Sequence, residues 1–502
     1  MRHPRLIRYL GTLFAVTLLI GCSNGAPSPQ AAAPASDPSL KRIGRWFADA
    51  QGRVVNLHGI NITMPEYPTD EDLAARYADD ARFLAANGLR IVRLTFFLSG
   101  LLPAPAQYDD RYLDQYAAVV RTLTGAGIYV MVDFHQDLYA NKYHGRGMPE
   151  WMCVDDGVPN LPDQGNLLLN YAVNPAPQRA FDNFWANAAA SDGIALQTHY
   201  VDALRHVAAR FHDNPLVLGY ELMNEPFPGS QFPTCASPLG CPVFDATLLT
   251  PFVQNTAQAL RQTEPGKIVF FEPNVTFDFG ARSWLGSSGD DNGVLSFHDY
   301  CLGEQFSVSP PGAAAGCDAI GERMQFSDAL DYSTSQGSSL ILTEFGDFNK
   351  PLDYDTSPVV QRLVDDADDF MVSWAYWHYD GLNSYALVYD SSVAPQGDNV
   401  AANIADTVVR PYPIAIAGTP QSWSYDRAAG IFTLTYSVAR ADGSGDFAAG
   451  STTEIVVPQR SYPQGYVVDA AGAAVVSNPD APLLVLQSSD GVDTIHVQVT
   501  PR

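Results

Sequence analysis

Short apolar runs alternate with amphipathic stretches between residues 54 and 378. Eight of these runs have the length and the β-branched or aromatic content of buried strands. They are Val54–Asn61, Leu89–Phe96, Ile128–His135, Leu216–Asn224, Lys267–Glu272, Val294–Tyr300, Leu340–Glu344 and Val372–His378. The segments between them include Asp72–Asn87, which has helical spacing and is followed by Gly88 as a C-terminal cap. This alternation predicts a parallel sheet whose strands are connected by helices.

Eight strand–helix repeats favour a closed (β/α)8 TIM barrel, which we assign to residues 43–410. The segment is longer than the usual ~250 residues of such a barrel, which implies long loops. The largest gap, between His135 and Leu216, can hold a helix and an elaborate loop. An open doubly wound sheet is the alternative, but no glycine-rich dinucleotide motif follows the first strand.

The pattern changes to period two after Arg410. The alternating segments are Phe432–Val438, Thr453–Val457, Gly465–Asp469, Leu483–Gln487 and Thr494–Val499. They are separated by Gly, Ser, Pro and Asp, which predicts a small antiparallel β-sandwich over residues 411–502. Because it carries no cluster of catalytic residue types, we expect it to brace the barrel; binding of sugar or membrane is the alternative.

Residues 1–22 have the features of a lipoprotein-type signal peptide. Arginines precede the apolar run Tyr9–Ile20, which is too short for the ~20 residues that a membrane span needs. Leu19-Ile20-Gly21-Cys22 resembles a bacterial lipobox, with Cys22 as the lipid-bearing residue; an ordinary signal peptide is the alternative. Residues 23–42 are rich in Ala, Pro and Ser and predict a flexible tether. We therefore expect a bacterial protein that is exported, either as a cell-envelope lipoprotein or in secreted form.

Export permits disulfides. Cys235 and Cys241 enclose a short loop, as do Cys301 and Cys317, so both pairs are candidate disulfides. Cys153 would remain a free thiol. No cysteine or histidine cluster has the spacing of a zinc site, and we expect no metal and no organic cofactor.

Composition narrows the function further. The chain has a formal net charge of −26, so its surface repels the phosphates of nucleic acids and anionic lipids. Hydrophobic residues make up 46% of it and charged residues 17%, which suits a large folded core. These properties favour a soluble, exported enzyme over a nucleic-acid-binding protein.

Polar and titratable side chains stand near the carboxyl ends of the predicted strands, where barrels carry their chemistry. They are Arg93, His135, Asn224, Glu225, His298, Tyr300, Glu344 and Trp377. Each alone has a structural explanation, but together they indicate a site. Two carboxylates, one protonated and one ionised, are what glycoside hydrolysis requires, and Glu225 and Glu344 supply them. Glu221 lies mid-strand, and we interpret it as a buried polar group without a catalytic role.

The same positions resemble, one by one, the hallmark residues of glycoside hydrolase family 5, whose members are retaining (β/α)8 enzymes. The resemblance implies Glu225 as acid/base and Glu344 as nucleophile. Stretches such as Asp133–Tyr139 and Gly219–Pro226 are similar to the endoglycoceramidases of that family. The resemblance to family 5 further implies a set of residues that bind the substrate or orient the site. They are Arg93, His135, Gln136, Asp137, Asn224, His298, Tyr300 and Trp377. The expected substrate is a glycolipid of glycan and ceramide, cleaved by a monomer that the Cys22 lipid attaches to a membrane.

Two features bear on the substrate. Members of the family carry a sugar-binding lysine after the first strand, whereas Ile62–Pro68 contains none, so the head group is expected to differ from a ganglioside glycan. Candidate apolar rims for a lipid are Phe96-Phe97-Leu98, Leu101-Leu102-Pro103, Phe227-Pro228 and Phe232-Pro233; packing beneath loops is the alternative. Steryl glucosides or β-glucans remain alternative substrates of the same chemistry. A glycan- or lipid-binding lipoprotein without turnover is the alternative outside enzymes.

Overall fold

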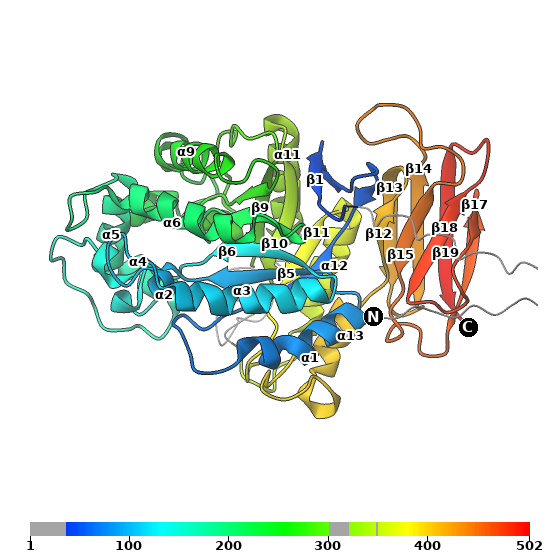
Figure 1. Ribbon diagram of the computed structural model, residues 1–502, viewed down its shortest axis with the longest axis horizontal. Helices are drawn as coiled ribbons and strands as arrows, with labels where there is room; N and C mark the ends of the chain where they lie inside the picture. The colour runs from blue at the N-terminus through cyan, green and yellow to red at the C-terminus, as the bar shows by residue number, and fades with distance from the viewer. Residues whose placement is uncertain (1–36, 301–320, 348–349) are drawn as a thin grey trace, which may run out of the picture. The chain divides into compact units, whose positions relative to one another are not determined.

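The computed structural model describes residues 37–300, 321–347 and 350–502. Eight parallel strands form a closed barrel in the order β10-β11-β4-β5-β6-β7-β8-β9 (Figure 1). Their bounds are β4 His58–Ile62, β5 Ile91–Phe96, β6 Tyr129–Phe134, β7 Val217–Glu221, β8 Ile268–Phe271, β9 Gly293–Asp299, β10 Ser339–Phe345 and β11 Ser373–Tyr376. The predicted TIM barrel is confirmed.

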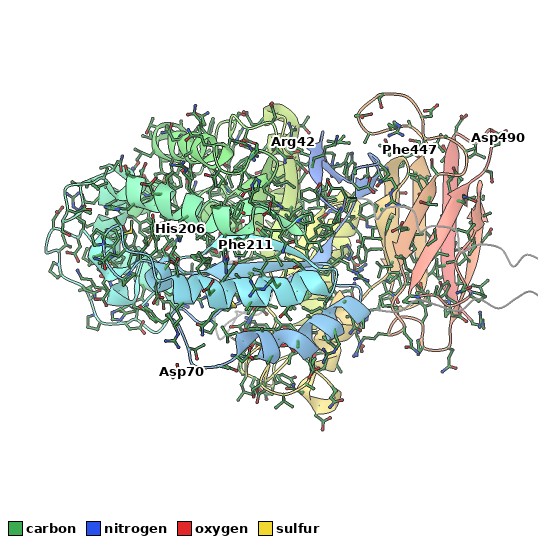
Figure 2. All side chains as sticks on the ribbon, in the orientation of Figure 1. Arg42, Asp70, His206, Phe211, Phe447 and Asp490 are labelled. Atoms are coloured by element: carbon green, nitrogen blue, oxygen red, sulfur yellow. A yellow bond between two sulfur atoms is a disulfide. The ribbon has the colours of Figure 1, made fainter. Side chains whose placement is uncertain are left out.

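Helices connect the strands and surround them (Figure 1). They are α1 Leu73–Ala86, α3 Asp110–Gly125, α6 Leu196–Phe211, α9 Thr250–Arg261, α11 Glu322–Gln336 and α12 Ser357–Phe370, with α13 Ala402–Val408 after the last strand. Each buries an apolar stripe against the barrel. On α6, for example, Phe211 is buried, whereas the half-buried His206 stacks on Tyr108 with ring centres 4.0 Å apart (Figure 2).

Long loops extend from the carboxyl ends of the strands. The segment between β6 and β7 contains α4 Leu167–Val173 and α5 Pro175–Trp185, which lie at the same end of the barrel as α2 Leu98–Leu101 (Figure 1). After β7, Cys235 at the end of α7 Phe232–Cys235 forms a disulfide with Cys241. Cys153 is half-buried and outside any disulfide. Cys22, Cys301 and Cys317 lie outside the described residues.

The C-terminal part contains two antiparallel sheets, with orders β1-β2-β3-β12-β15-β18-β17 and β13-β14-β19-β16. The C-terminal strands are β12 Tyr412–Ile416, β13 Thr419–Asp426, β14 Ile431–Ser437, β15 Thr452–Val456, β16 Tyr466–Ala471, β17 Ala473–Val475, β18 Leu483–Ser488 and β19 Thr494–Pro501. The N-terminal members are β1 Lys41–Ile43, β2 Trp46–Ala48 and β3 Val54–Val55.

The first predicted strand, Val54–Asn61, is divided in the structure. Val54 and Val55 pair with β12 of the C-terminal sheet, and the barrel strand β4 begins at His58. Residues 43–55, which the sequence placed within the barrel domain, and Lys41 and Arg42, which it placed in the tether, therefore complete the C-terminal sheet. An apolar run gives the propensity for a strand but does not say which sheet the strand joins.

The C-terminal sheets contact the amino ends of the barrel strands. The Tyr412 hydroxyl donates to the carbonyl of Gly88, just before β5, over 2.7 Å. Trp423 Nε1 donates to Asp368 Oδ1 over 2.9 Å, near the end of α12. The candidate residues lie at the carboxyl ends instead, so the sheets buttress the barrel away from the site. Among the described residues no helix has the length and apolar character needed to cross a membrane.

Candidate active site

Arg93 of β5 is fully buried and connects several strands at the centre of the site. Its Nε donates to Glu221 Oε2 over 2.6 Å, and its Nη2 donates to Asn224 Oδ1 over 2.7 Å. Its Nη1 donates to Glu344 Oε1. Burial alone would lower the pKa of Arg93, but the surrounding carboxylates raise it well above its usual value. A fixed positive charge therefore faces Glu344.

Glu344 lies near the end of β10. In addition to the bond from Arg93, the Tyr300 hydroxyl donates to Glu344 Oε2 over 2.9 Å. Burial and the charge of Glu344 raise the pKa of Tyr300 well above its usual value, so the phenol keeps the proton that it donates. The carboxylate is thus held by two donors.

Glu225 follows β7 in a left-handed backbone conformation, with φ of 44°. That conformation is costly for a residue with a side chain and is characteristic of functional sites. It is held in place because the Glu225 amide donates to Glu272 Oε2 over 2.8 Å. Burial raises the pKa of the Glu225 carboxyl, and the negative charge of Glu344 raises it further. Glu225 is therefore suited to carry a proton.

His298 of β9 lies between the two carboxylates. Its Nδ1 is 3.1 Å from Glu225 Oε1 and 3.8 Å from Glu344 Oε2. These two oxygens are therefore no farther apart than the sum of the two distances. That limit accommodates the ~5–5.5 Å separation of retaining glycosidases and reaches only the lower end of the ~6.5–9.5 Å range of inverting ones.

A cavity of about 200 Å³ opens beside the two carboxylates. Its lining residues are His135, Asp137, Arg146, Leu167, Leu168, Tyr171, Glu225, Phe279, Tyr300, Glu344, Trp377 and Tyr385. The lining thus combines charged groups from the loop after β6 with the apolar side chains of Leu167, Leu168 and Phe279. A site of this kind can hold a polar group and an apolar group of one substrate.

The comparisons with known proteins agree with this geometry. Residues 48–382 match the cellulase family, glycosyl hydrolase family 5, and residues 410–500 match the family 5 C-terminal domain. The chain belongs to glycoside hydrolase family 5. It is 30% identical over 472 residues to endoglycoceramidase I of Rhodococcus hoagii (strain 103S), covering 92% of this chain and 88% of the relative.

Solved structures extend the comparison. The endo-glycoceramidase II of Rhodococcus sp. in complex with ganglioside GM3 is 28% identical, with a TM-score of 0.71. The same protein as a lactosyl-enzyme intermediate is 29% identical, with a TM-score of 0.70; both comparisons cover 91% of this chain and 99% of the other. A covalent glycosyl-enzyme is the intermediate of a double displacement. This family 5 chain is accordingly a retaining glycoside hydrolase.

In this family 5 site, His135 and Trp377 face each other. Their rings are nearly parallel, with centres 5.7 Å apart. His135 Nδ1 lies 2.8 Å from Asp133 Oδ2, and its Nε2 lies 3.3 Å from Asp137 Oδ2. Burial disfavours the imidazolium, but these two aspartates raise the pKa of His135 to about 9. A charged His135 and the indole of Trp377 therefore form one wall of the cavity.

Gln136 and Asn224 do not line the cavity, but their hydrogen bonds orient residues of the site. Gln136 Nε2 donates to the carbonyls of Asn224 and Glu225, each over 3.0 Å. Asn224 Nδ2 donates to the Gln136 carbonyl over 3.0 Å, while its Oδ1 accepts from Arg93. Asn224 therefore orients Arg93 and the chain that follows β6.

Most residues of the predicted apolar rims are buried, whereas Phe232 is half-buried and Pro103 and Pro233 are exposed. Phe96, Phe97, Leu98, Leu101 and Leu102 are at most 2% exposed, and Phe227 is fully buried. Phe227 packs on the rings of Tyr171 and Phe181, with centres 4.5 and 5.3 Å away. These side chains pack beneath the loops, because loops of this length need an apolar core of their own. The apolar lining comes instead from α4 and from Phe279.

Sequence reasoning left out three acidic residues of the site: Asp133, Glu272 and Asp278. Glu272 was visible as a carboxylate in an apolar run, but nothing in the run indicated that it holds the Glu225 backbone. Among the described residues, Glu225, Asp278 and His298 have ligand atoms within 4.8 Å of one another, a spacing that could hold a metal. The neighbouring carboxylates overcome burial and raise the pKa of His298 well above its usual value. The protonated ring can donate from Nδ1 to Glu225 Oε1, 3.1 Å away.

Proposed function

We propose that this protein is a retaining endo-β-glycosidase that hydrolyses the linkage between glycan and ceramide in glycosphingolipids. The main support is the similarity to an endoglycoceramidase over nearly the whole chain. Two further observations support the proposal. The two carboxylates are as close together as those of a retaining enzyme, and apolar side chains line the same cavity.

In the first step, Glu344 attacks the anomeric carbon of the sugar next to ceramide. The bond from that carbon to the ceramide oxygen breaks, a bond to the Glu344 carboxylate forms, and Glu225 gives its proton to the departing oxygen. Arg93 and Tyr300 hold the attacking carboxylate, so little reorganisation is needed. In the second step, water gives a proton to Glu225 and attacks the same carbon, which releases the glycan and restores Glu344.

The change in the role of Glu225 follows from the electrostatics of the pair. The negative charge of Glu344 contributes to the raised pKa of Glu225. That charge disappears when Glu344 becomes an ester, so the proton affinity of Glu225 falls in the intermediate. His298, charged and 3.1 Å away, then stabilises the Glu225 carboxylate. Glu225 is thus an acid before the covalent intermediate forms and a base afterwards.

The apolar part of the cavity is suited to the lipid. Leu167 and Leu168 of α4 line the cavity, and Leu169 and Val173 of the same helix are 47% and 48% exposed. Exposed leucine and valine side chains on a cavity-forming helix are costly in water, and ceramide chains leaving the cavity would cover them.

The decisive experiment is product analysis. We expect the mature protein to release intact glycan and ceramide from detergent-dispersed glycosphingolipids, and Glu344→Gln to release neither while remaining folded by circular dichroism. Head groups ranging from a single hexose to a ganglioside glycan would show whether the loop at Ile62–Pro68, without a lysine, favours small head groups. Hydrolysis of steryl glucosides or β-glucans with no ceramide released would replace the proposed substrate while keeping the chemistry.

We also propose, from the sequence alone, that the protein is exported and carries a lipid on Cys22, and that it acts as a monomer. Mass spectrometry of the N-terminal peptide from a bacterial envelope fraction should show a diacylglyceryl cysteine at residue 22, and Cys22→Ser should lack it. An unmodified N-terminus in the culture medium would contradict the anchor, and light scattering would test the monomer.

A further inference from the structure

Arg146 is held in a defined position at the wall of the cavity. Its amide donates to the Asp137 carbonyl over 2.8 Å, and the Asp137 amide donates to its carbonyl over 3.1 Å. The flanking glycines permit this close approach: a Cβ at Gly145 would lie 1.8 Å from the Asp137 carbonyl oxygen, and one at Gly147 would lie 2.3 Å from that of His135. The backbone at Arg146 is therefore pressed against the chain that follows β6.

The side chain is fixed at one end and free at the other. Arg146 Nε donates to Asp137 Oδ2 over 2.6 Å, and the guanidinium lies over the ring of Phe97, 5.5 Å from its centre. Among the described residues none accepts a hydrogen bond from Nη1 or Nη2. The side chain is 32% exposed and lines the cavity. Four N–H bonds of an anchored, charged group are thus available to a bound molecule.

These donors line the same small cavity as the nucleophile Glu344. Burial opposes the charge of Arg146, but the carboxylates of Asp137, Glu344 and Glu66 together raise its pKa. The sugar becomes attached to Glu344, so a charged group in this cavity is within reach of the sugar. Tyr385 and Trp377 line the same cavity and can enclose a sugar ring.

We propose that Arg146 binds two neighbouring hydroxyl groups of the sugar that Glu344 attacks, and thereby selects the head group. This inference rests on the proposed function. A guanidinium presents parallel N–H donors in a rigid fork, which a lysine ammonium does not reproduce. The competing explanation is that Arg146 only pairs with Asp137 to fix the loop, a role that a lysine could largely fill.

Arg179 provides a matched control. Its Nε donates to Asp156 Oδ2 over 2.6 Å, the same distance as in the Arg146–Asp137 pair, but Arg179 does not line the cavity. We would compare wild type, Arg146→Lys and Arg179→Lys on a glycosphingolipid that the wild type cleaves, and on analogues of it that lack one sugar hydroxyl each. The thermal midpoint of each variant would show whether the fold is retained.

For Arg146→Lys we expect a roughly 10- to 100-fold fall in kcat/KM on the complete sugar, because charge-assisted hydrogen bonds are lost. Arg179→Lys should stay within about threefold of wild type, as for an exposed ion pair. Removing one contacted hydroxyl from the substrate should lower the kcat/KM of the wild type by a comparable factor. The same removal should lower the kcat/KM of Arg146→Lys only slightly. That non-additivity identifies the hydroxyl and would not arise from a purely structural role.

Equal sensitivity of wild type and Arg146→Lys to every missing hydroxyl would overturn the proposal, as would near-normal kcat/KM of the lysine variant. If no glycolipid is cleaved, the proposed function fails independently. The same hydroxyl comparison on whichever glycoside the wild type hydrolyses would then test Arg146 by itself.

Discussion

At the residue scale, the distribution of one proton between two carboxyl groups carries the chemistry. Burial and the nearby charge of Glu344 raise the pKa of Glu225, which suits it to carry the proton, whereas Glu344 accepts hydrogen bonds from Arg93 and Tyr300. Neither environment depends on the loops that recognise a particular substrate. The assignment of roles can therefore be tested with simple substrates.

We predict that Glu225→Gln discriminates between leaving groups. A ceramide oxygen needs a proton to depart, so its kcat/KM should fall by roughly 10²- to 10⁴-fold, the usual contribution of general acid catalysis. A nitrophenolate departs unaided, so kcat/KM on nitrophenyl glycosides should be nearly preserved. The measurement is the ratio of the two losses, and equal losses would contradict the acid role.

The same residue should determine how activity falls at high pH. The raised pKa of Glu225 means that the acid form persists above the usual range of a glutamic acid and is lost as the pH rises through the raised value. The basic limb of kcat/KM against pH should therefore lie above pH ~4.3, the ordinary glutamate value. On nitrophenyl glycosides, whose leaving group needs no proton, this limb should be absent already in the wild type. A limb that stays in place would assign the titration to another group, such as His135.

At the scale of elements, α4 is the helix that we propose contacts the lipid. We predict that Leu168→Ser lowers kcat/KM on ceramide glycosides by roughly 5- to 50-fold, as expected for losing a buried leucine contact. It should have little effect on nitrophenyl glycosides of the same sugar. Leu239→Ser is a suitable control, because Leu239 is 72% exposed and does not line the cavity. A loss shared by both substrate types would indicate a disturbed site and not a lost lipid contact.

The barrel could be read from the sequence because its eight strands are buried apolar runs separated by amphipathic helices. The polar ends of those strands also came together as expected, since parallel strands deliver their carboxyl ends to one face. The burial of the apolar rims could not be predicted, because composition does not distinguish a leucine that packs under a loop from one that lies beside a cavity. The position of Arg146 could not be predicted either, because it depends on the approach of two glycines to the chain that follows β6, which no local sequence pattern records.

At the scale of the whole molecule, the C-terminal sheets contact the barrel at the end opposite the site. Asp368 of α12 illustrates the link, since it accepts from Trp423 and pairs with Arg410 at 2.7 Å. The segment before the barrel, residues 41–55, completes the same sheet. Barrel and sheets thus share elements from both ends of the described chain, so we expect them to unfold together.

The protein should be more stable near pH 5 than near pH 7.5. Burial raises the pKa of Asp80, Asp245, Asp366 and Asp368 to about 6 in the folded state, against 3.8 for an ordinary aspartate. The folded state therefore binds more protons than the unfolded chain between these values, so the free energy of unfolding falls as the pH rises through this window. His135, with a pKa of about 9, acts in the same direction, whereas His378, lowered to about 4, acts against it.

Asp80→Asn isolates one of these contributions. Asp80 Oδ1 accepts from the Tyr379 hydroxyl over 2.5 Å, and an asparagine oxygen can accept the same bond. Because the amide cannot ionise, the variant should gain on the order of 3 kcal/mol over wild type at pH 7.5 and about half of that at pH 5. Denaturant unfolding at the two pH values measures both differences. A gain of equal size at both pH values would mean that packing, and not the titration of Asp80, had changed.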